Sequence, residues 1–149
     1  ELGNHWKGQF FTPYNVCECM ASITINDNVQ TLEKQEWISV NDPACGAGAT
    51  LVAAANIFHR KKINYQTQVL FTANDIDRVV AQMCYIQLSL LGCAGWVAVA
   101  NTISNPVCGD PLMPVEKPGQ EFWYTPFYFR EEWNCRRQVQ ILKKCAAHG

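Results

Sequence analysis

Three short apolar stretches recur along the chain, and an acidic or amide residue follows each of them. They are predicted to be strands at 37–40, 68–73 and 96–100. Between them, the segments 49–60 and 77–91 have the periodicity of helices. Strand, helix, strand, helix, strand is the order of a parallel α/β sheet with right-handed crossovers. This order limits the fold class to α/β with a mostly parallel sheet.

The residues that follow these strands are predicted to form a ligand site. Asp42, Asp75 and Asn101 come directly after or at the ends of the three strands. In parallel α/β sheets, ligands bind outside the carboxyl ends of the strands. Gly46 and Gly48 follow the first acid in the segment DPACGAG, and glycines allow a tight turn close to a ligand. The helix after this loop directs its free N–H groups and positive dipole end at the same place.

The glycine loop differs from the loops that bind phosphates. It is neither G-x-G-x-x-G nor a P-loop, because no lysine follows the second glycine. Asp42 would repel a phosphate and attract an ammonium group, so we expect a ligand with an amino-acid moiety. Asp75 is suited to accept hydrogen bonds from ribose hydroxyls, and Ile76 to pack on a purine. An amino acid joined to adenosine describes S-adenosylmethionine, which we predict as the cofactor.

Three segments carry a resemblance to a known family. DPACGAG at 42–48 resembles the cofactor motif of adenine-specific (N6) DNA methyltransferases, especially the modification subunits of type I restriction systems. GQFFTP at 8–13 is similar to the motif that these enzymes carry upstream. NDID at 74–77, followed by LLG at 90–92, resembles their second strand and helix. Together these segments cover residues 8–101.

The resemblance implies a Rossmann-like fold of the S-adenosylmethionine-dependent methyltransferases and leaves open whether that fold is complete here. It places the Phe-Thr-Pro segment and the glycine loop at the methionine end of the cofactor, Asp75 at the ribose and Ile76 at the adenine. Asn101 stands where the family often has an acid near the adenine ring. The expected cofactor-binding residues are Phe11, Thr12, Pro13, Asp42, Pro43, Ala44, Gly46, Gly48, Asp75, Ile76 and Asn101.

The family's catalytic motif, Asn/Asp/Ser-Pro-Pro-Tyr/Phe, does not occur in the sequence. In the family its first residue accepts a hydrogen bond from the target amino group, and its aromatic ring stacks on the flipped base. Asn105-Pro106 keeps only the first two positions, and Thr125-Pro126-Phe127-Tyr128 replaces the acceptor and the second proline. The weak catalytic candidates are Asn105, Pro106, Thr125 and Tyr128. Whether the chain is an active enzyme is therefore left open.

The chain is predicted to be one domain spanning 1–149. Its motif-bearing core at 8–101 is followed by an excursion at 102–130 that is rich in proline and aromatic residues, and by a closing helix at 131–145. The prolines exclude regular helix from the excursion. We expect its aromatic cluster to form an apolar lid over the sheet, with base stacking as the alternative. The possible core contacts of the closing helix are Trp133, Val139 and Leu142.

A further helix is predicted at the start of the core. Thr12 is expected as its N-cap and Pro13 as its first residue. The apolar residues Val16, Met20 and Ile23 recur at helical spacing, and the polar residues 24–36 are expected to form a loop.

Composition limits the partners and the compartment. The net charge is −1, so binding to nucleic acid would need a local basic patch or a partner chain. The eight cysteines come without a signal-like N-terminus, and several lie in apolar segments, which favours a reducing, cytoplasmic location. No apolar run is long enough to span a membrane, and Cys17-Glu-Cys19 lacks zinc-ligand spacing, so we expect neither membrane nor metal.

The leading hypothesis is an S-adenosylmethionine-binding domain of a DNA adenine methyltransferase-like protein. We expect methyl transfer to DNA to need additional protein, with DNA reached through a partner or a region outside this chain. The other subunits of a restriction–modification system are the expected protein partners. The alternative is a catalytically inactive module of the same fold that modulates such a system. Methylation of a small molecule or a protein is a third possibility.

Overall fold

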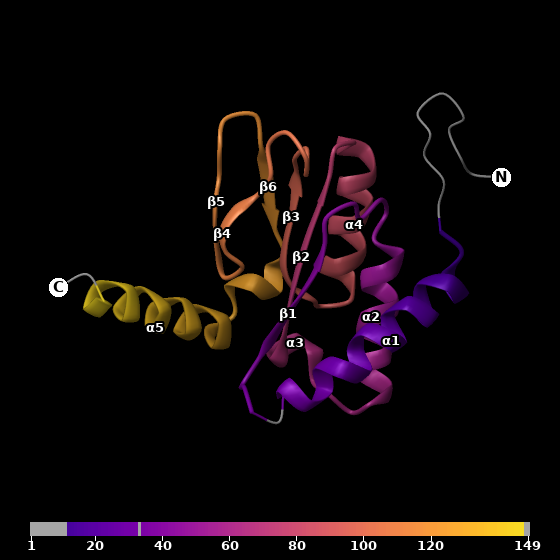
Figure 1. The fold of residues 1–149 in the computed structure, drawn as a ribbon, viewed down its shortest axis with the longest axis horizontal. Coiled ribbons are helices and arrows are strands. Elements are labelled where there is room, and N and C mark those ends of the chain that lie inside the picture. The colour runs from indigo at the N-terminus through magenta and orange to yellow at the C-terminus, as the bar shows by residue number, and fades with distance from the viewer. Residues whose placement is uncertain (1–11, 33, 148–149) are drawn as a thin grey trace.

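The computed structural model describes residues 12–32 and 34–147 (Figure 1). Each predicted strand and helix of the alternating core is found within a few residues of its expected bounds. The elements in chain order are α1 (Tyr14–Leu32), β1 (Ile38–Asp42), α2 (Ala49–Arg60), α3 (Tyr65–Gln68), β2 (Val69–Asp75), α4 (Arg78–Leu90), β3 (Ala94–Val99), β4 (Cys108–Asp110), β5 (Met113–Val115), β6 (Glu121–Tyr124), η1 (Pro126–Phe129) and α5 (Glu131–Ala147).

The main sheet has four strands in the order β1-β2-β3-β6. The first three strands are parallel, which confirms the predicted α/β class with a mostly parallel sheet. Asp42 lies opposite Ala73 in the register, and Asp75 lies opposite Val99. The carboxyl ends of the three parallel strands therefore meet at one edge of the sheet, where the polar residues that follow them gather.

Three helices cover one face of this sheet. Figure 1 shows α1, α2 and α4 on the same side of the strands. Leu51 and Phe58 of α2 are almost fully buried there, together with Val69 and Phe71 of β2. Burying such a side chain contributes about 1.5–3 kcal/mol, so this layer supplies much of the core stability and holds α2 behind the glycine loop.

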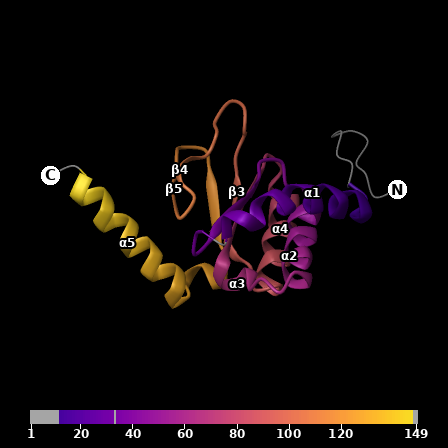
Figure 2. The same ribbon diagram turned by 60° about the horizontal axis from the view of Figure 1, so that its bottom comes forward.

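The C-terminal third of the chain covers part of the other face. Leu70, Trp96 and Ala98 of the sheet are buried against η1 and α5, which contribute Tyr128 and Trp133. The β4–β5 hairpin forms a separate sheet of two strands. In Figures 1 and 2, α5 extends away from the sheet toward the C-terminus.

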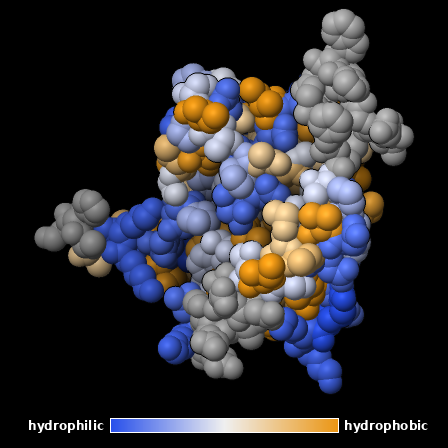
Figure 3. Space-filling model, turned by 45° about the vertical axis from the view of Figure 1, so that its right-hand side comes forward, coloured by the Kyte–Doolittle hydropathy of each residue, from blue (hydrophilic) through white to orange (hydrophobic). Residues whose placement is uncertain are grey.

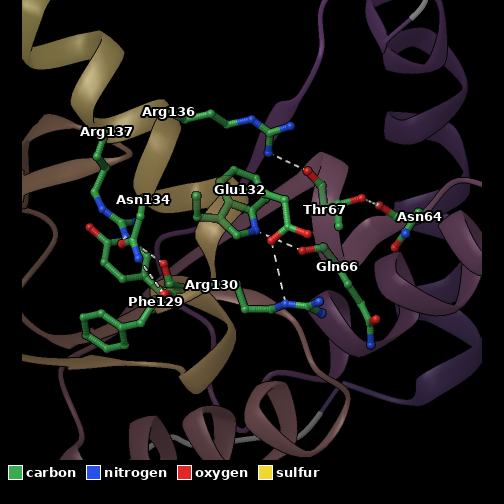
Figure 4. A network of polar contacts seen from close by, with 11 residues as sticks. Asn64, Gln66, Thr67, Phe129, Arg130, Glu132, Asn134, Arg136 and Arg137 are labelled. Atoms are coloured by element: carbon green, nitrogen blue, oxygen red, sulfur yellow. Dashed lines mark hydrogen bonds and ion pairs between the residues drawn. The ribbon is translucent and has the colours of Figure 1, made fainter.

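Trp133 anchors α5 to the amino ends of the strands. It is fully buried, and its Nε1 donates a hydrogen bond to the carbonyl of Gln66 (2.9 Å). Arg136 stacks on this ring and donates to the carbonyl of Thr67 (Figure 4). Val139 and Leu142, in contrast, are 49% and 68% exposed. The prediction of core contacts is thus confirmed for Trp133 and wrong for the other two, because α5 leaves the body of the molecule beyond its first turns.

The first helix is longer than predicted. α1 continues to Leu32, so the expected loop at 24–36 is wrong for most of its length. The helix begins at Tyr14, one residue later than expected, and the Pro13 carbonyl accepts its first backbone hydrogen bonds.

The buried face of α1 also differs from the apolar stripe seen in the sequence. Cys17, Ala21 and Ile25 face the core, whereas Met20 and Ile23 are 53% and 65% exposed. Figure 3, which brings this side of the molecule forward, shows orange apolar groups among blue polar ones. Small buried residues let α1 pack closely on α2, and this close packing outweighs the pattern of larger residues.

The excursion at 102–130 contains three short strands that were not predicted. β6 pairs antiparallel with β3, and its side chains alternate between the two faces. Trp123 joins the core beneath the helices, while Phe122 and Tyr124 pack on the opposite side. The expected apolar lid is wrong for the first three aromatic residues of the cluster, which form a strand of the sheet, whereas Phe127 and Tyr128 do pack against its other face. Pro114 lies in the two-stranded hairpin, where a proline is tolerated at an edge.

No helix within 12–32 and 34–147 has the length and apolar character that crossing a membrane requires.

Candidate functional site

The glycine loop connects β1 to α2 at the carboxyl edge of the sheet. Gly46 and Gly48 have φ angles of +51° and +88°, in the left-handed region that favours glycine. A Cβ atom on Gly48 would lie only 2.7 Å from the Sγ atom of Cys84 on α4. Gly48 is therefore required both for its backbone conformation and for the close approach of the loop to α4.

Asp75 holds this loop in place. Its Oδ2 atom accepts a hydrogen bond from the backbone N–H of Gly46 (2.8 Å), and its Oδ1 atom accepts one from Asp77 (2.9 Å). The predicted role in binding ribose did not include this contact, which joins residues 29 positions apart. A carboxylate offers about four lone pairs, so Asp75 keeps acceptor capacity for a ligand.

Asp42 lies at the start of the loop, and its environment disfavours a negative charge. Burial raises the pKa of its carboxyl above the usual value. The N–H of Ala44, which donates to Oδ1 over 3.2 Å, opposes this shift, and the charge of Asp75 adds to it. A positively charged ligand group at this position would relieve the unfavourable burial, whereas a phosphate would increase it.

Two hollows meet at Ala44. The first has a volume of about 460 Å³, lies between α1, β1 and α2, and is lined in part by Thr12, Asp42 and Thr50. The second has a volume of about 440 Å³ and is lined by Pro43, Ala44, Asp75, Ile76, Ala100, Asn101, Thr102 and Ile103. We call them the α1 hollow and the Asp75 hollow. Because Ala44 lines both, the two hollows adjoin each other.

The two hollows differ in chemistry. Thr50 of the α1 hollow belongs to the first turn of α2, whose free N–H groups favour a carboxylate. The Asp75 hollow exposes the apolar side chains of Ile76 (68% exposed) and Ile103 (94% exposed) beside a carboxylate. The arrangement suits a ligand with an amino-acid end, a hydroxylated middle and a flat apolar end.

The remaining cofactor candidates take different positions. Thr12 is exposed and lines the α1 hollow, and Pro13 lies beside it at the start of α1. Phe11 lies outside the described residues. Asn101 lines the Asp75 hollow, but its Oδ1 atom accepts hydrogen bonds from the N–H groups of Ile103 (2.9 Å) and Ser104 (3.0 Å). Through its Oδ1 atom, this side chain closes the turn after β3.

Thr125 and Tyr128 lie at the wrong end of the sheet for catalysis. Since β6 is antiparallel, its last residue, Tyr124, pairs with Trp96 near the start of β3. Thr125 is fully buried; its Oγ1 donates to the carbonyl of Cys93 (2.7 Å) and accepts from the N–H of Gly95 (3.0 Å). Tyr128 is 6% exposed, and its hydroxyl donates to the carbonyl of Leu112. Both residues stabilise the fold and are remote from the glycine loop.

Asn105 follows the carboxyl end of β3, at the same edge of the sheet as the glycine loop, but its side-chain amide is already hydrogen-bonded within the chain. Its Nδ2 donates to the carbonyl of Pro118 (3.1 Å), and its Oδ1 accepts from Gln120 Nε2 (3.5 Å). These bonds fold the segment after β3 onto the turn before β6. Pro106 lines a further pocket.

Asn74 and Thr102 are site residues that the sequence did not identify individually. Asn74 is 5% exposed, and its Nδ2 donates to the Pro43 carbonyl (3.1 Å) and to Thr102 Oγ1 (2.7 Å). The Thr102 hydroxyl donates to the same Pro43 carbonyl (2.5 Å). The pair fixes the loop backbone just after Asp42. The sequence did carry one signal for this pair: Asn74 lies within an apolar strand, and a buried amide group needs hydrogen-bond partners.

A comparison with protein families finds one family whose model matches most of the chain. The family model described as N-6 DNA Methylase matches residues 3–123. The match therefore extends from before α1 into β6 and includes every described residue that lines the two hollows. No curated protein and no solved structure matches the chain.

Proposed function

Because the chain belongs to the N-6 DNA methylase family, we propose that it binds S-adenosylmethionine across the α1 and Asp75 hollows in the service of methyl transfer to adenine in DNA. The family normally uses this cofactor. The observation that carries the proposal is the meeting of the two hollows at Ala44, with Asp42 lining one and Asp75 lining the other.

Each part of the cofactor has a suitable group in the chain. Asp42 would receive the ammonium group, and the N–H groups at the start of α2 would receive the carboxylate. The lone pairs that Asp75 retains would accept from the ribose hydroxyls, and Ile76 and Ile103 would pack on the adenine. When bound, the cofactor supplies a sulfonium methyl group.

We further propose that methyl transfer requires additional protein. Thr125 and Tyr128 are remote from the loop, and the Asn105 amide is engaged, so none of them offers a free acceptor for the target amino group. Within the described part of the chain, β1 has a strand neighbour only on its β2 side. Its other edge presents backbone N–H and C=O groups to which a strand of a partner can pair. Other subunits of a restriction–modification system are the proposed source of that strand, and a cytoplasmic location agrees with such a role.

The second candidate is an inactive module of the same fold. It is favoured by the engagement of Thr125 and Asn105 in structural hydrogen bonds. In that case the chain would bind the cofactor, or a partner, without moving a methyl group.

Calorimetry with S-adenosylmethionine tests the cofactor site. At about 100 μM protein, a ligand that binds with micromolar affinity gives a clear signal. Absence of heat, together with unchanged thermal stability in excess cofactor, would refute the proposed site. Asp42→Ala should weaken binding, while Glu116→Ala, an exposed acid near the hairpin, should not.

Transfer of a tritiated methyl group to unmodified DNA separates the two candidate functions. The chain alone should transfer none, and addition of the partner subunits should start transfer. Cofactor binding without transfer under both conditions would favour the inactive module.

A further inference from the structure

The outward face of α4 is apolar, although helices at a protein surface carry polar residues on that side. The inward face packs on the sheet (Figure 1) through four buried residues, Val80, Ala81, Cys84 and Leu88. The opposite face exposes four large apolar side chains by 63%, 42%, 54% and 83%: Val79, Met83, Ile86 and Leu90. We call these four residues the α4 ridge. Because a helix that is hydrophobic all round belongs in an interior, the α4 ridge indicates a surface that an assembly covers.

The α4 ridge is continuous along the helix. Its members are spaced by four, three and four residues, which places them in one stripe of the helix surface. This is the spacing of the a and d positions in a coiled coil. At a rise of about 1.5 Å for each residue, the stripe is about 17 Å long. A second helix can therefore pack along it by inserting its own side chains between these four.

The surroundings of the α4 ridge are nearly free of charge. Within α4, the exposed residues besides the ridge are Arg78 and Gln82. Arg78 already forms an ion pair with Glu121 over 3.0 Å. A partner helix with a strongly charged face would find no opposite charge along the ridge, whereas a second α4 would meet no like charge there. The chemistry of this face therefore fits its own copy.

We propose that the α4 ridge is the interface of a homodimer, in which the α4 helices of two copies pack antiparallel about a twofold axis. The spacing of four, three and four residues is the same in both directions along the helix. Antiparallel packing therefore brings Val79 opposite Leu90 of the partner subunit, and Met83 opposite Ile86 of the partner subunit. The same patch is used on both copies, so the contact closes as a dimer and does not continue into a filament.

The size of the α4 ridge sets the expected strength of this dimer. The exposed fractions of its side chains add up to about 2.4 whole side chains in each copy. Standard stable interfaces take about 20–30 residues from each partner, and the ridge supplies fewer. We therefore expect a reversible dimer, with a Kd of about 10–100 μM. No ridge residue lines the α1 hollow or the Asp75 hollow, so the inference stands independently of the proposed function.

α1 carries a second exposed apolar stripe, which provides the matched control. Val16, Met20 and Ile23 are 43%, 53% and 65% exposed. This stripe has three members, so it does not match the four positions of the ridge. A contact between α4 of one copy and α1 of another would be head-to-tail, and it would extend into larger assemblies unless it formed a ring.

Sedimentation equilibrium on the whole chain, from about 5 to 500 μM, tests the dimer. The mass of the wild type should rise from 16.8 kDa toward twice that value. Ile86→Asp places a charge in the interface and should raise the Kd at least about tenfold. Ile23→Asp on α1, at a position of similar exposure, should leave the Kd unchanged. Both positions are exposed in the single copy, so both variants should remain folded by circular dichroism.

A pair of opposite charges tests the antiparallel register. Met83→Glu and Ile86→Lys should each be monomeric alone. Their equimolar mixture should form a heterodimer, because the introduced carboxylate and ammonium groups then lie opposite each other. A mixture that stays monomeric would contradict the antiparallel arrangement.

Three results of the sedimentation experiment would overturn the inference. The first is a wild type that stays at 16.8 kDa throughout the concentration range. The second is a dimer that survives Ile86→Asp. The third is association that is lost in Ile86→Asp and in Ile23→Asp alike, which would assign the contact to α4 of one copy and α1 of another.

Discussion

Replacing Asp75 tests whether it binds ribose or only holds the loop. Asp75→Ala removes the acceptors for the N–H groups of Gly46 and Asp77. Each hydrogen bond to a charged group contributes about 1.5–3 kcal/mol, and water can replace part of it at this half-exposed site, so we expect a total loss of about 2–4 kcal/mol of unfolding free energy. Asp77→Ala is the control. It removes the cap on α4, where its Oδ1 accepts from the N–H of Val79, and should cost about 1 kcal/mol.

Affinity alone does not separate these roles, since a disordered loop also binds less tightly. The decisive variant is Asp75→Asn, which keeps the size of the side chain and one acceptor. The probes are 5′-methylthioadenosine and its 2′-deoxy counterpart, measured by calorimetry. If Asp75 accepts from the ribose, the wild type should prefer the hydroxylated ligand by about 1–3 kcal/mol, and the variant should lose most of that preference. An equal loss of affinity for both ligands would refute ribose binding and leave Asp75 as a support of the loop.

Three further predictions concern the loop and the C-terminal helix. Gly48→Ala should lower the unfolding free energy, measured in urea, by about 2–3 kcal/mol, because it combines a strained left-handed backbone with overpacking against Cys84. Gly46→Ala has open space around its Cβ and should cost about 1 kcal/mol, so equal losses for the two variants would contradict the packing argument. Asp42→Asn should stabilise the protein at neutral pH, since folding raises the pKa of this carboxyl, and the same substitution should lower cofactor affinity. The gain in unfolding free energy should shrink as the pH falls through the raised pKa toward 3.8, and a gain that persists in acid would point to another cause. Trp133→Ala should cost about 3–5 kcal/mol in thermal or urea unfolding and Leu142→Ala less than about 0.5 kcal/mol, and a large effect of the second would show that the outer part of α5 is packed in solution.

The parallel core was predictable because its signals are local. Each strand is a short apolar run, and Asp42, Asp75 and Asn101 mark the ends at which parallel strands converge. The positions of Gly46 and Gly48 could be predicted from the same stretch, because a left-handed turn requires glycine in most contexts. These features needed no knowledge of what packs against them.

The features that the sequence did not reveal depend on distant contacts. Glu121–Tyr124 becomes a strand because β3 offers it a free edge and because both of its faces are covered by other parts of the chain. Thr125 resembled a catalytic residue in sequence, but the direction of β6 carries it to the far end of the sheet. α1 extends past residue 24 through packing on α2, which overrides a weak local pattern.

β1 carries the glycine loop and is also the outermost strand of the described sheet. A strand that adds to its open edge would restrict the backbone leading into Asp42. Binding of the partner and binding of the ligand would then both order the same segment of the chain. Thermodynamic linkage then makes their effects reciprocal: whatever factor the partner adds to cofactor affinity, the cofactor adds to partner affinity. Assembly of the complex would thereby respond to the supply of methyl donor.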